Sequence, residues 1–133
     1  MKGSYIFVLT LDSFVELQLS RTRWELNPGT YAYIGSGMGN LEKRVERHFS
    51  SDKRLRWHID YLTCYGKPLF AILIPSKERI EEKISLTFQS HFSCVEGFGA
   101  SDLKVMSNLY IIDDFQKFSE VVIYFLTQEG EKP

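Results

Sequence analysis

The stretch YAYIGSGMGNLEKRVERHF, residues 31–49, decides the fold because the spacing of its inward-facing residues changes within it. Its opening tyrosines alternate with smaller residues, so residues 30–34 are predicted to form a strand. The glycines at 35, 37 and 39 are expected to make a tight turn. The pattern then becomes helical, with Asn40 as a suitable N-cap and inward positions at Leu41, Val45, His48 and Phe49.

Before this stretch, the first third of the chain predicts an antiparallel β-meander. Residues 5–11 are rich in β-branched and aromatic side chains, and residues 14–19 alternate apolar with polar positions. A short strand around Trp24 ends at the turn signal Asn27-Pro28-Gly29. Each of these segments has the length and pattern of a strand in a small sheet.

After this stretch, helices and strands are predicted to alternate. We expect a second helix from Lys53 to about Thr63, and the continuous apolar run at 69–74 is typical of a central strand. A third helix is expected to open at Pro75-Ser76, followed by an ordered loop at 97–101. The inward positions of these two helices would be Leu55, Ile59 and Leu62, then Ile80, Ile84 and Phe88.

A last strand at 109–112 and a last helix at 115–126 complete the predicted fold. A chain of 133 residues fits a single domain. We expect that domain to span residues 1–128 and to be followed by a flexible C-terminal tail at 129–133.

Composition narrows the class of protein. The apolar fraction of 44% and the charged fraction of 25% are ordinary for a globular protein. No apolar run approaches the roughly 20 residues of a membrane-spanning helix, and residues 1–3 lead straight into a strand, so we expect a cytoplasmic protein with no membrane partner. Its two cysteines, Cys64 and Cys94, suit a reducing compartment.

The net charge of -1 conceals an asymmetry. Residues 1–76 carry ten Lys or Arg against seven Asp or Glu, whereas residues 77–133 carry six against ten. A basic cluster that could contact a nucleic-acid backbone consists of Lys43, Arg47, Lys53, Arg54 and Arg56. On charge alone an ordinary solvated helix face is favoured, because Glu42 and Glu46 are interleaved with these cations.

The glycines do not predict a nucleotide cradle. Gly35-x-Gly37-x-Gly39 matches a dinucleotide-binding fingerprint only in part, and it follows antiparallel strands where that fingerprint needs a βαβ unit. The chain also lacks the Gly-Lys-Ser/Thr of a P-loop. A tight turn between strand and helix is the simpler interpretation.

The helix that follows the glycines carries more chemical information. Arg44 and His48 are four residues apart and share one helical face. A planar guanidinium in that position matches the oxygens of a phosphodiester, and Tyr5 and Tyr33 would reach the same pocket if their strands pair. Taken singly, each of these residues has a structural explanation. Only their joint spacing favours a site.

Gly3-Ser4-Tyr5 and Tyr33-Ile34-Gly35, followed by Leu41-x-x-Arg44-x-x-x-His48, resemble the motifs of the GIY-YIG nuclease superfamily. The chain is most similar to a branch of that superfamily catalogued as a domain of unknown function, found alone in prokaryotes or fused to endonuclease III-type proteins. Segments 28–36, 57–62 and 97–102 match that branch in order, over nearly the whole chain. The wide gap between the first two motifs departs from the compact superfamily spacing but is similar to this branch.

The resemblance implies an α+β fold in which a small antiparallel β-sheet is flanked by helices. It also implies a GIY-YIG-like endonuclease that hydrolyses phosphodiester bonds with one divalent ion, Mg²⁺ or Mn²⁺. Tyr5, assisted by Tyr33, would act as general base or orient the attacking water, and Arg44 would stabilise charge on the phosphoryl oxygens. Glu81 is the expected metal ligand, with Glu82 as the alternative. The implied substrate is DNA rather than RNA, in repair or processing, with a targeting protein as a further partner.

Two features leave alternatives open. His58 either contacts phosphate or takes part in proton transfer, with Asp60 orienting it; alternatively, the segment 57–61 packs on the sheet and Asp60 satisfies a buried polar group. A Cys-x-Cys and a histidine of the branch are replaced here, by Leu103, Val105 and Asn108. The alternative functions are accordingly a non-catalytic nucleic-acid-binding module or a protein-interaction domain.

Overall fold

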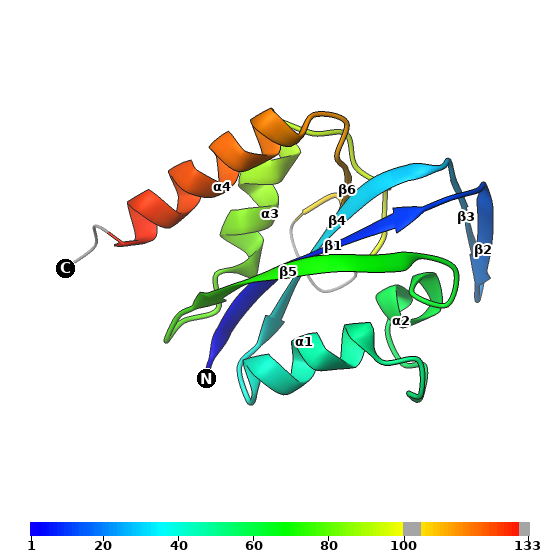
Figure 1. Ribbon diagram of the computed structural model, residues 1–133, viewed down its shortest axis with the longest axis horizontal. Coiled ribbons are helices and arrows are strands. Elements are labelled where there is room, and N and C mark those ends of the chain that lie inside the picture. Colours follow the sequence, from blue (N-terminus) through cyan, green and yellow to red (C-terminus); the bar gives the residue numbers. More distant parts are fainter. Residues whose placement is uncertain (100–104, 131–133) are drawn as a thin grey trace.

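The computed structural model describes residues 1–99 and 105–130, with side chains described up to residue 127. Within these ranges the protein has an α+β fold with six strands and four helices (Figure 1). The strands are β1 (Gly3–Leu11), β2 (Val15–Leu19), β3 (Thr22–Leu26), β4 (Gly29–Gly37), β5 (Lys67–Pro75) and β6 (Leu109–Ile111). The helices are α1 (Leu41–Phe49), α2 (His58–Leu62), α3 (Glu81–Gln89) and α4 (Phe115–Gly130). The predicted fold class is confirmed.

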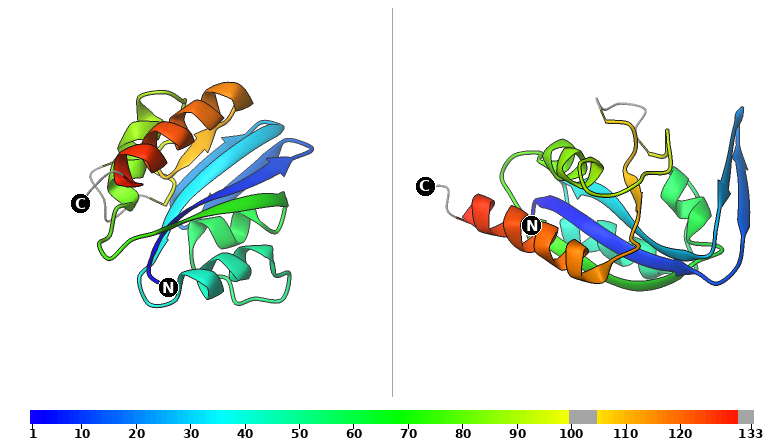
Figure 2. Two further views of the ribbon diagram at one scale, coloured as in Figure 1. Left: turned by 60° about the vertical axis from the view of Figure 1, so that its left-hand side comes forward. Right: turned by 90° about the horizontal axis from the view of Figure 1, so that it is seen from above.

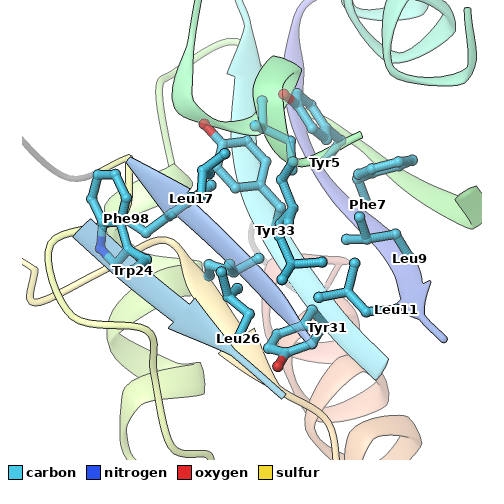
Figure 3. Packing of buried hydrophobic residues seen from close by; sticks show 14 of the residues in the cluster. Tyr5, Phe7, Leu9, Leu11, Leu17, Trp24, Leu26, Tyr31, Tyr33 and Phe98 are labelled. Atoms are coloured by element: carbon cyan, nitrogen blue, oxygen red, sulfur yellow. The ribbon is translucent and has the colours of Figure 1, made fainter. Parts of the chain in front are cut away.

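Four strands form one antiparallel sheet in the order β5-β1-β4-β6. Alternate residues of β1 point to opposite faces, and Figure 3 shows Tyr5, Phe7, Leu9 and Leu11 in a row on one of them. The residues between them pack on the other face, with Ile6 and Val8 fully buried. Because both faces are covered, β1 is apolar without interruption over residues 5–9.

The helices divide between the two faces (Figures 1 and 2). Helices α1 and α2 cover one face, and α3 and α4 cover the other. The short α1 is amphipathic: Leu41 and Val45 are buried against the sheet, and the Asn40 side chain accepts from the Lys43 amide as the predicted N-cap. The sheet therefore separates two hydrophobic clusters.

The predicted β-meander is wrong in its pairing. Strand β1 pairs with β4 along all nine residues, from Gly3 opposite Gly37 to Leu11 opposite Gly29. Strands β2 and β3 pair with each other in a separate two-stranded sheet at one end of the molecule (Figure 1). The long apolar strands match each other in length and burial, whereas β2 and β3 alternate buried and exposed residues like a hairpin with one wet face.

Strand β5 is an edge strand rather than the central strand that its apolar run predicted. Pro68 and Pro75 lack the amide N–H that an interior ladder needs, and an edge tolerates them. Leu69 and Phe70 are partly exposed. Within the run only Ile74 is buried and residues 71–73 are half-buried, so an apolar run of this length does not require a central position in the sheet.

The predicted glycine turn at 35–39 is shorter than expected, because β4 continues to Gly37. A Cβ on Gly35 would lie 2.3 Å from the Tyr5 hydroxyl, since the Tyr5 ring crosses this cross-strand neighbour. A Cβ on Gly37 would lie 2.8 Å from the Leu41 Cα. These two glycines make room for a ring and for a helix.

The second helix begins at His58, five residues later than predicted, and Leu55 is partly exposed instead of inward. The Asp60 carboxylate accepts hydrogen bonds from the Arg56 and Trp57 amides, at 2.9 and 3.0 Å. The side chain of Asp60 thereby binds two amides just before the helix, which have no carbonyl partner within it. These bonds mark the start of α2 and explain why the helix does not extend back to Lys53.

The third helix also begins later than predicted, at Glu81, because Ser76 first forms a turn in which its hydroxyl accepts from the Glu78 amide. Helix α4 continues to Gly130, past the predicted end at residue 126 and into the first two residues of the expected tail. Residues 100–101 of the expected ordered loop and residues 131–133 lie outside the described residues.

Candidate functional site

A pocket of about 250 Å³ lies beside the second half of β4. Strand β6 pairs with β4 only at residues 31–33, so the edge of β4 beyond them is free of a neighbouring strand among the described residues. Six segments converge there, and the lining residues are Tyr5, Tyr33, Gly35, Ser36, Arg44, His48, Trp57, Ile59, Arg79, Glu81 and Gly99. Four of the five predicted catalytic residues and one of the two candidate metal ligands are in this set.

Tyr5 and His48 form a buried pair at the floor of the pocket. The Tyr5 hydroxyl and His48 Nε2 are 2.5 Å apart, and both side chains are about 1% exposed. Burial lowers the pKa of His48 to about 4, and burial together with the neighbouring Tyr33 raises the pKa of Tyr5 well above its usual value. At neutral pH the two groups are therefore an uncharged hydrogen-bonded pair.

Tyr33 lies beside this pair, with its ring centroid 6.4 Å from that of Tyr5. Figure 3 shows the two hydroxyls at the same end of the cluster. Burial, followed by the charge of Glu81, raises the pKa of Tyr33, so this phenol is also neutral at physiological pH. Pairing of β1 with β4 thus brings together two phenols that are far apart in sequence.

Arg44 reaches the pocket from α1, whose close approach to the sheet depends on Gly37. Its guanidinium carbon lies 4.2 Å from the centroid of the Trp57 ring. In the part of the chain that the structure describes, the guanidinium has no ion pair and no hydrogen bond. Its N–H donors are therefore available to a ligand.

Glu81 lines the opposite side of the pocket, at the first residue of α3. The residue is only 8% exposed, and its Oε1 accepts a hydrogen bond of 3.1 Å from the Ser36 hydroxyl. Arg79 lies 3.7 Å from the same oxygen. Glu82 is not among the lining residues. Of the two predicted metal ligands, only Glu81 therefore faces Tyr5 and Arg44.

These residues fit one Mg²⁺ or Mn²⁺ ion. Mg²⁺ usually keeps several waters and binds through one or two carboxylates and substrate oxygens. Glu81 supplies a carboxylate that the Ser36 hydroxyl orients. Among the described residues no group of three or more His, Cys, Asp or Glu gathers to hold a metal. An ion here would depend on Glu81, water and substrate.

His58 is not brought into the pocket, contrary to its predicted place in the catalytic set. Its ring packs against Trp24 and Phe98, and its Nδ1 accepts a 2.9 Å hydrogen bond from the Gly99 amide. Gly99 in turn lies against the Tyr33 ring. His58 therefore stands behind the pocket and fixes a lining residue. Burial lowers the pKa of its imidazole.

Asp60 takes the structural role that the sequence left open. It is fully buried, and its Oδ2 accepts from Arg47 at 2.7 Å as well as from two backbone amides. Burial alone would raise the pKa of this carboxyl, but the bonds from Arg47 and the amides outweigh it and hold the pKa below its usual value. Among the described residues, no hydrogen bond or ion pair joins the Asp60 carboxylate to His58.

The predicted basic cluster is divided by these contacts. Arg47 is occupied by Asp60 and by the Arg54 carbonyl, and Lys53 donates to the Arg47 and His48 carbonyls at the end of α1. Lys43, Arg54 and Arg56 have exposed side chains. Three of the five residues predicted to contact a nucleic-acid backbone are therefore exposed to solvent. The other two, Arg47 and Lys53, make contacts within the protein.

Three side chains that contact predicted site residues were not predicted from the sequence: Ser36, Arg79 and, as the partner of Arg44, Trp57. The other lining residues outside the predicted set are Gly35, Ile59 and Gly99. Ser36 lies inside the quoted stretch, next to Gly35, and that position was the available signal. Nothing in the periodicity indicates Arg79. Of the positions where the branch has other residues, Asn108 donates from Nδ2 to the Gly99 carbonyl and Val105 is buried, while Leu103 lies outside the described residues.

The fold and pocket define a single-domain α+β protein with a polar site at the free edge of β4. The chain belongs to the family described as domain of unknown function DUF123, whose model matches residues 4–130. No curated protein and no solved structure matches the chain. None of the helices in the described ranges has the length and apolar character needed to cross a membrane.

Proposed function

We propose that this pocket is the active site of a divalent-metal-dependent endonuclease related to the GIY-YIG nucleases, with DNA favoured over RNA. One observation carries the proposal: Tyr5, Tyr33, Arg44 and Glu81 line a single pocket although four different elements supply them. Two phenols, a guanidinium with unused donors and a carboxylate are the groups that phosphodiester hydrolysis needs.

In the proposed reaction Arg44 binds the non-bridging oxygens of the scissile phosphate and stabilises the charge that develops on them. Tyr5 orients the attacking water through its hydroxyl, which His48 Nε2 fixes at 2.5 Å. This role suits Tyr5 better than that of a standing base, because burial disfavours its charged form. Tyr33 lies beside Tyr5 and offers a second hydroxyl to the same water.

Glu81 would hold the ion, and the Ser36 hydroxyl would keep its carboxylate turned toward the pocket. When bound, a divalent ion neutralises charge on the phosphoryl and leaving oxygens. Arg79, which lies 3.7 Å from Glu81, would have to release the carboxylate to make room. Its side chain is mostly exposed, so this movement requires little rearrangement.

The contact between Arg79 and Glu81 also supports a second candidate, a module that binds nucleic acid without cutting it. In that function Arg79 remains paired and Glu81 is a structural acceptor for Ser36. Arg44 would still bind phosphate. The two candidates differ in whether Glu81 matters to cleavage or only to folding.

The test combines binding and cleavage. Binding of single-stranded, nicked and branched DNA is measured across a salt series without metal, and phosphate contacts predict that log affinity falls linearly with log salt. Cleavage of the same substrates is then measured in Mg²⁺ and Mn²⁺. Arg44→Ala is expected to weaken both strongly, whereas Lys43→Ala, at an exposed neighbour on α1, weakens binding only slightly.

A flat salt response would overturn both nucleic-acid functions. Salt-dependent binding without cleavage on any of these substrates would leave the non-catalytic module. RNA of matched structure, cut faster than DNA, would reverse the proposed substrate preference.

A further inference from the structure

The indole of Trp57 lies against the guanidinium of Arg44, with 4.2 Å from the Arg44 carbon to the ring centroid. Trp57 precedes α2, Arg44 belongs to α1, and both line the pocket. Arg47 and Arg56 also lie near this ring, at 5.0 and 5.3 Å. Three guanidinium groups within about 6 Å of one half-buried indole form a cation–π cluster, which a tryptophan packed only by apolar contacts would not show.

In the described part of the chain, stacking on Trp57 leaves the N–H donors of the Arg44 guanidinium unoccupied. Within residues 1–99 and 105–130 no carboxylate pairs with this guanidinium, and the nearby Glu42 pairs instead with the Met1 amino group at 3.3 Å. A carboxylate would occupy the edge N–H groups of the guanidinium, whereas an aromatic ring attracts its flat face. Stacking therefore fixes Arg44 and leaves its N–H edge free.

The indole itself is anchored through its backbone. The Trp57 amide donates to the Asp60 carboxylate at 3.0 Å, and Asp60 also pairs with Arg47 at 2.7 Å. This pairing neutralises the charge of Arg47, so Arg47 does not repel Arg44 from the same ring at full strength. Because these bonds use the amide, they persist whichever side chain stands at position 57.

We propose that Trp57 is a positioning residue: its ring holds the guanidinium of Arg44 by stacking, with the N–H edge turned into the pocket to receive a phosphate. The proposal deepens the proposed function and rests on it for the identity of the ligand. The geometry of the stack is independent of that function.

The first test measures the stack without any substrate. The Arg44 side-chain signals of the wild-type protein are expected to carry a ring-current shift in NMR spectra. Trp57→Leu should remove that shift, and Trp57→Phe should retain part of it. Phe49→Leu, which removes a partly exposed ring elsewhere on α1, should leave the shift unchanged. An unshifted Arg44 signal, or a shift that survives in Trp57→Leu, overturns the proposal whether or not the protein cuts nucleic acid.

The second test measures what the stack does for binding. Affinity for a short oligothymidine in EDTA should fall about 10-fold in Trp57→Leu and less than about 3-fold in Trp57→Phe, as expected for loss and partial retention of a cation–π contact. With Arg44→Ala already present, Trp57→Leu should cause no further loss. Additive losses would show that Trp57 acts independently of Arg44 and would overturn the proposal.

The two failures are distinguishable. If the wild-type protein binds no oligothymidine, the nucleic-acid function fails, and the NMR result alone decides whether Trp57 positions Arg44. Thermal unfolding of each variant, measured alongside, separates lost stability from lost positioning, because Trp57→Phe should bind well even where its unfolding temperature falls.

Discussion

The two faces of the four-stranded sheet are both buried, but they bury different chemistry. The face under α3 and α4 is aliphatic and aromatic, and its Tyr110 hydroxyl is satisfied by Ser85 at 2.6 Å. The face under α1 carries Tyr5 and His48 instead, with the His48 Nδ1 left without a partner among the described residues. The first face still supplies Glu81 to the pocket from α3, so the two faces differ in how much of the site each one contributes.

The largest expected loss of stability comes from a substitution in the face under α3 and α4. Phe118→Ala should lower the free energy of unfolding by about 3–5 kcal/mol, because Phe118 on α4 is 4% exposed and packs against Phe88. Oligonucleotide affinity, measured well below the unfolding temperature, should not change. Phe115→Ala, on the same helix but half exposed, is the control and should cost much less. Lost affinity in a folded Phe118→Ala protein would contradict the division between the faces.

The next effect concerns the site face. Asp60→Ala should lower the free energy of unfolding by about 3 kcal/mol, at the lower end for a broken buried ion pair because Arg47 is 22% exposed. The exposed Asp52 is the matched control, and Asp52→Ala should change stability by less than about 0.5 kcal/mol. Equal losses from both substitutions would mean that Asp60 does not organise the start of α2.

The stability of the protein should fall at acid pH because the site face contains the buried imidazole of His48. Its pKa is about 4 in the folded protein and 6.5 when unperturbed, so between these values the unfolded chain binds more protons. Stability from this group is therefore complete above pH 6.5 and decreases by up to about 3 kcal/mol as the pH falls to 4.

The measurement is chemical denaturation as a function of pH. His48→Gln should flatten the slope between pH 6.5 and 4, and His91→Gln, at an exposed position, should keep the wild-type slope. An unchanged slope in His48→Gln would mean that this imidazole is not held neutral by burial.

The smallest effect lies outside both faces. Arg23 pairs with Glu16 and Glu25 on the exposed hairpin, and its side chain is 53% exposed. Arg23→Ala should cost less than about 1 kcal/mol in unfolding measurements and nothing in affinity. A larger stability loss would show that the hairpin contributes more to the core than its surface ion pairs indicate.

The elements were predictable because their patterns are local. Residues 31–49 and the caps around Asn40 follow from alternation, helical spacing and side-chain chemistry. The pairing of β1 with β4 and the edge position of β5 were not, because strand order depends on which lengths and faces match across the chain. The same limit applies to Asp60, whose carboxylate starts a helix that the sequence placed five residues earlier.

The candidate site was predictable where residue type and spacing coincide. Arg44, His48 and the two tyrosines share chemistry that a motif can record. His58 and Arg47 have the same side-chain types as site residues, yet Gly99 and Asp60 occupy them, and only the packed structure reveals such partners. Arg79 and Ser36 entered the site through the three-dimensional meeting of β4 with α3.

The central claim is that Glu81 completes a cleaving site opposite Arg44. Single-turnover cleavage of a DNA substrate in Mg²⁺ tests it, with Glu81→Gln compared with Glu82→Gln one residue away. Glu81→Gln should bind DNA as tightly as wild type but cleave it at least about 100-fold more slowly, as expected for loss of a group that acts in the transition state. Glu82→Gln should cleave at the wild-type rate. Cleavage by Glu81→Gln at the wild-type rate would mean that Glu81 has no part in cleavage and would overturn the proposed active site.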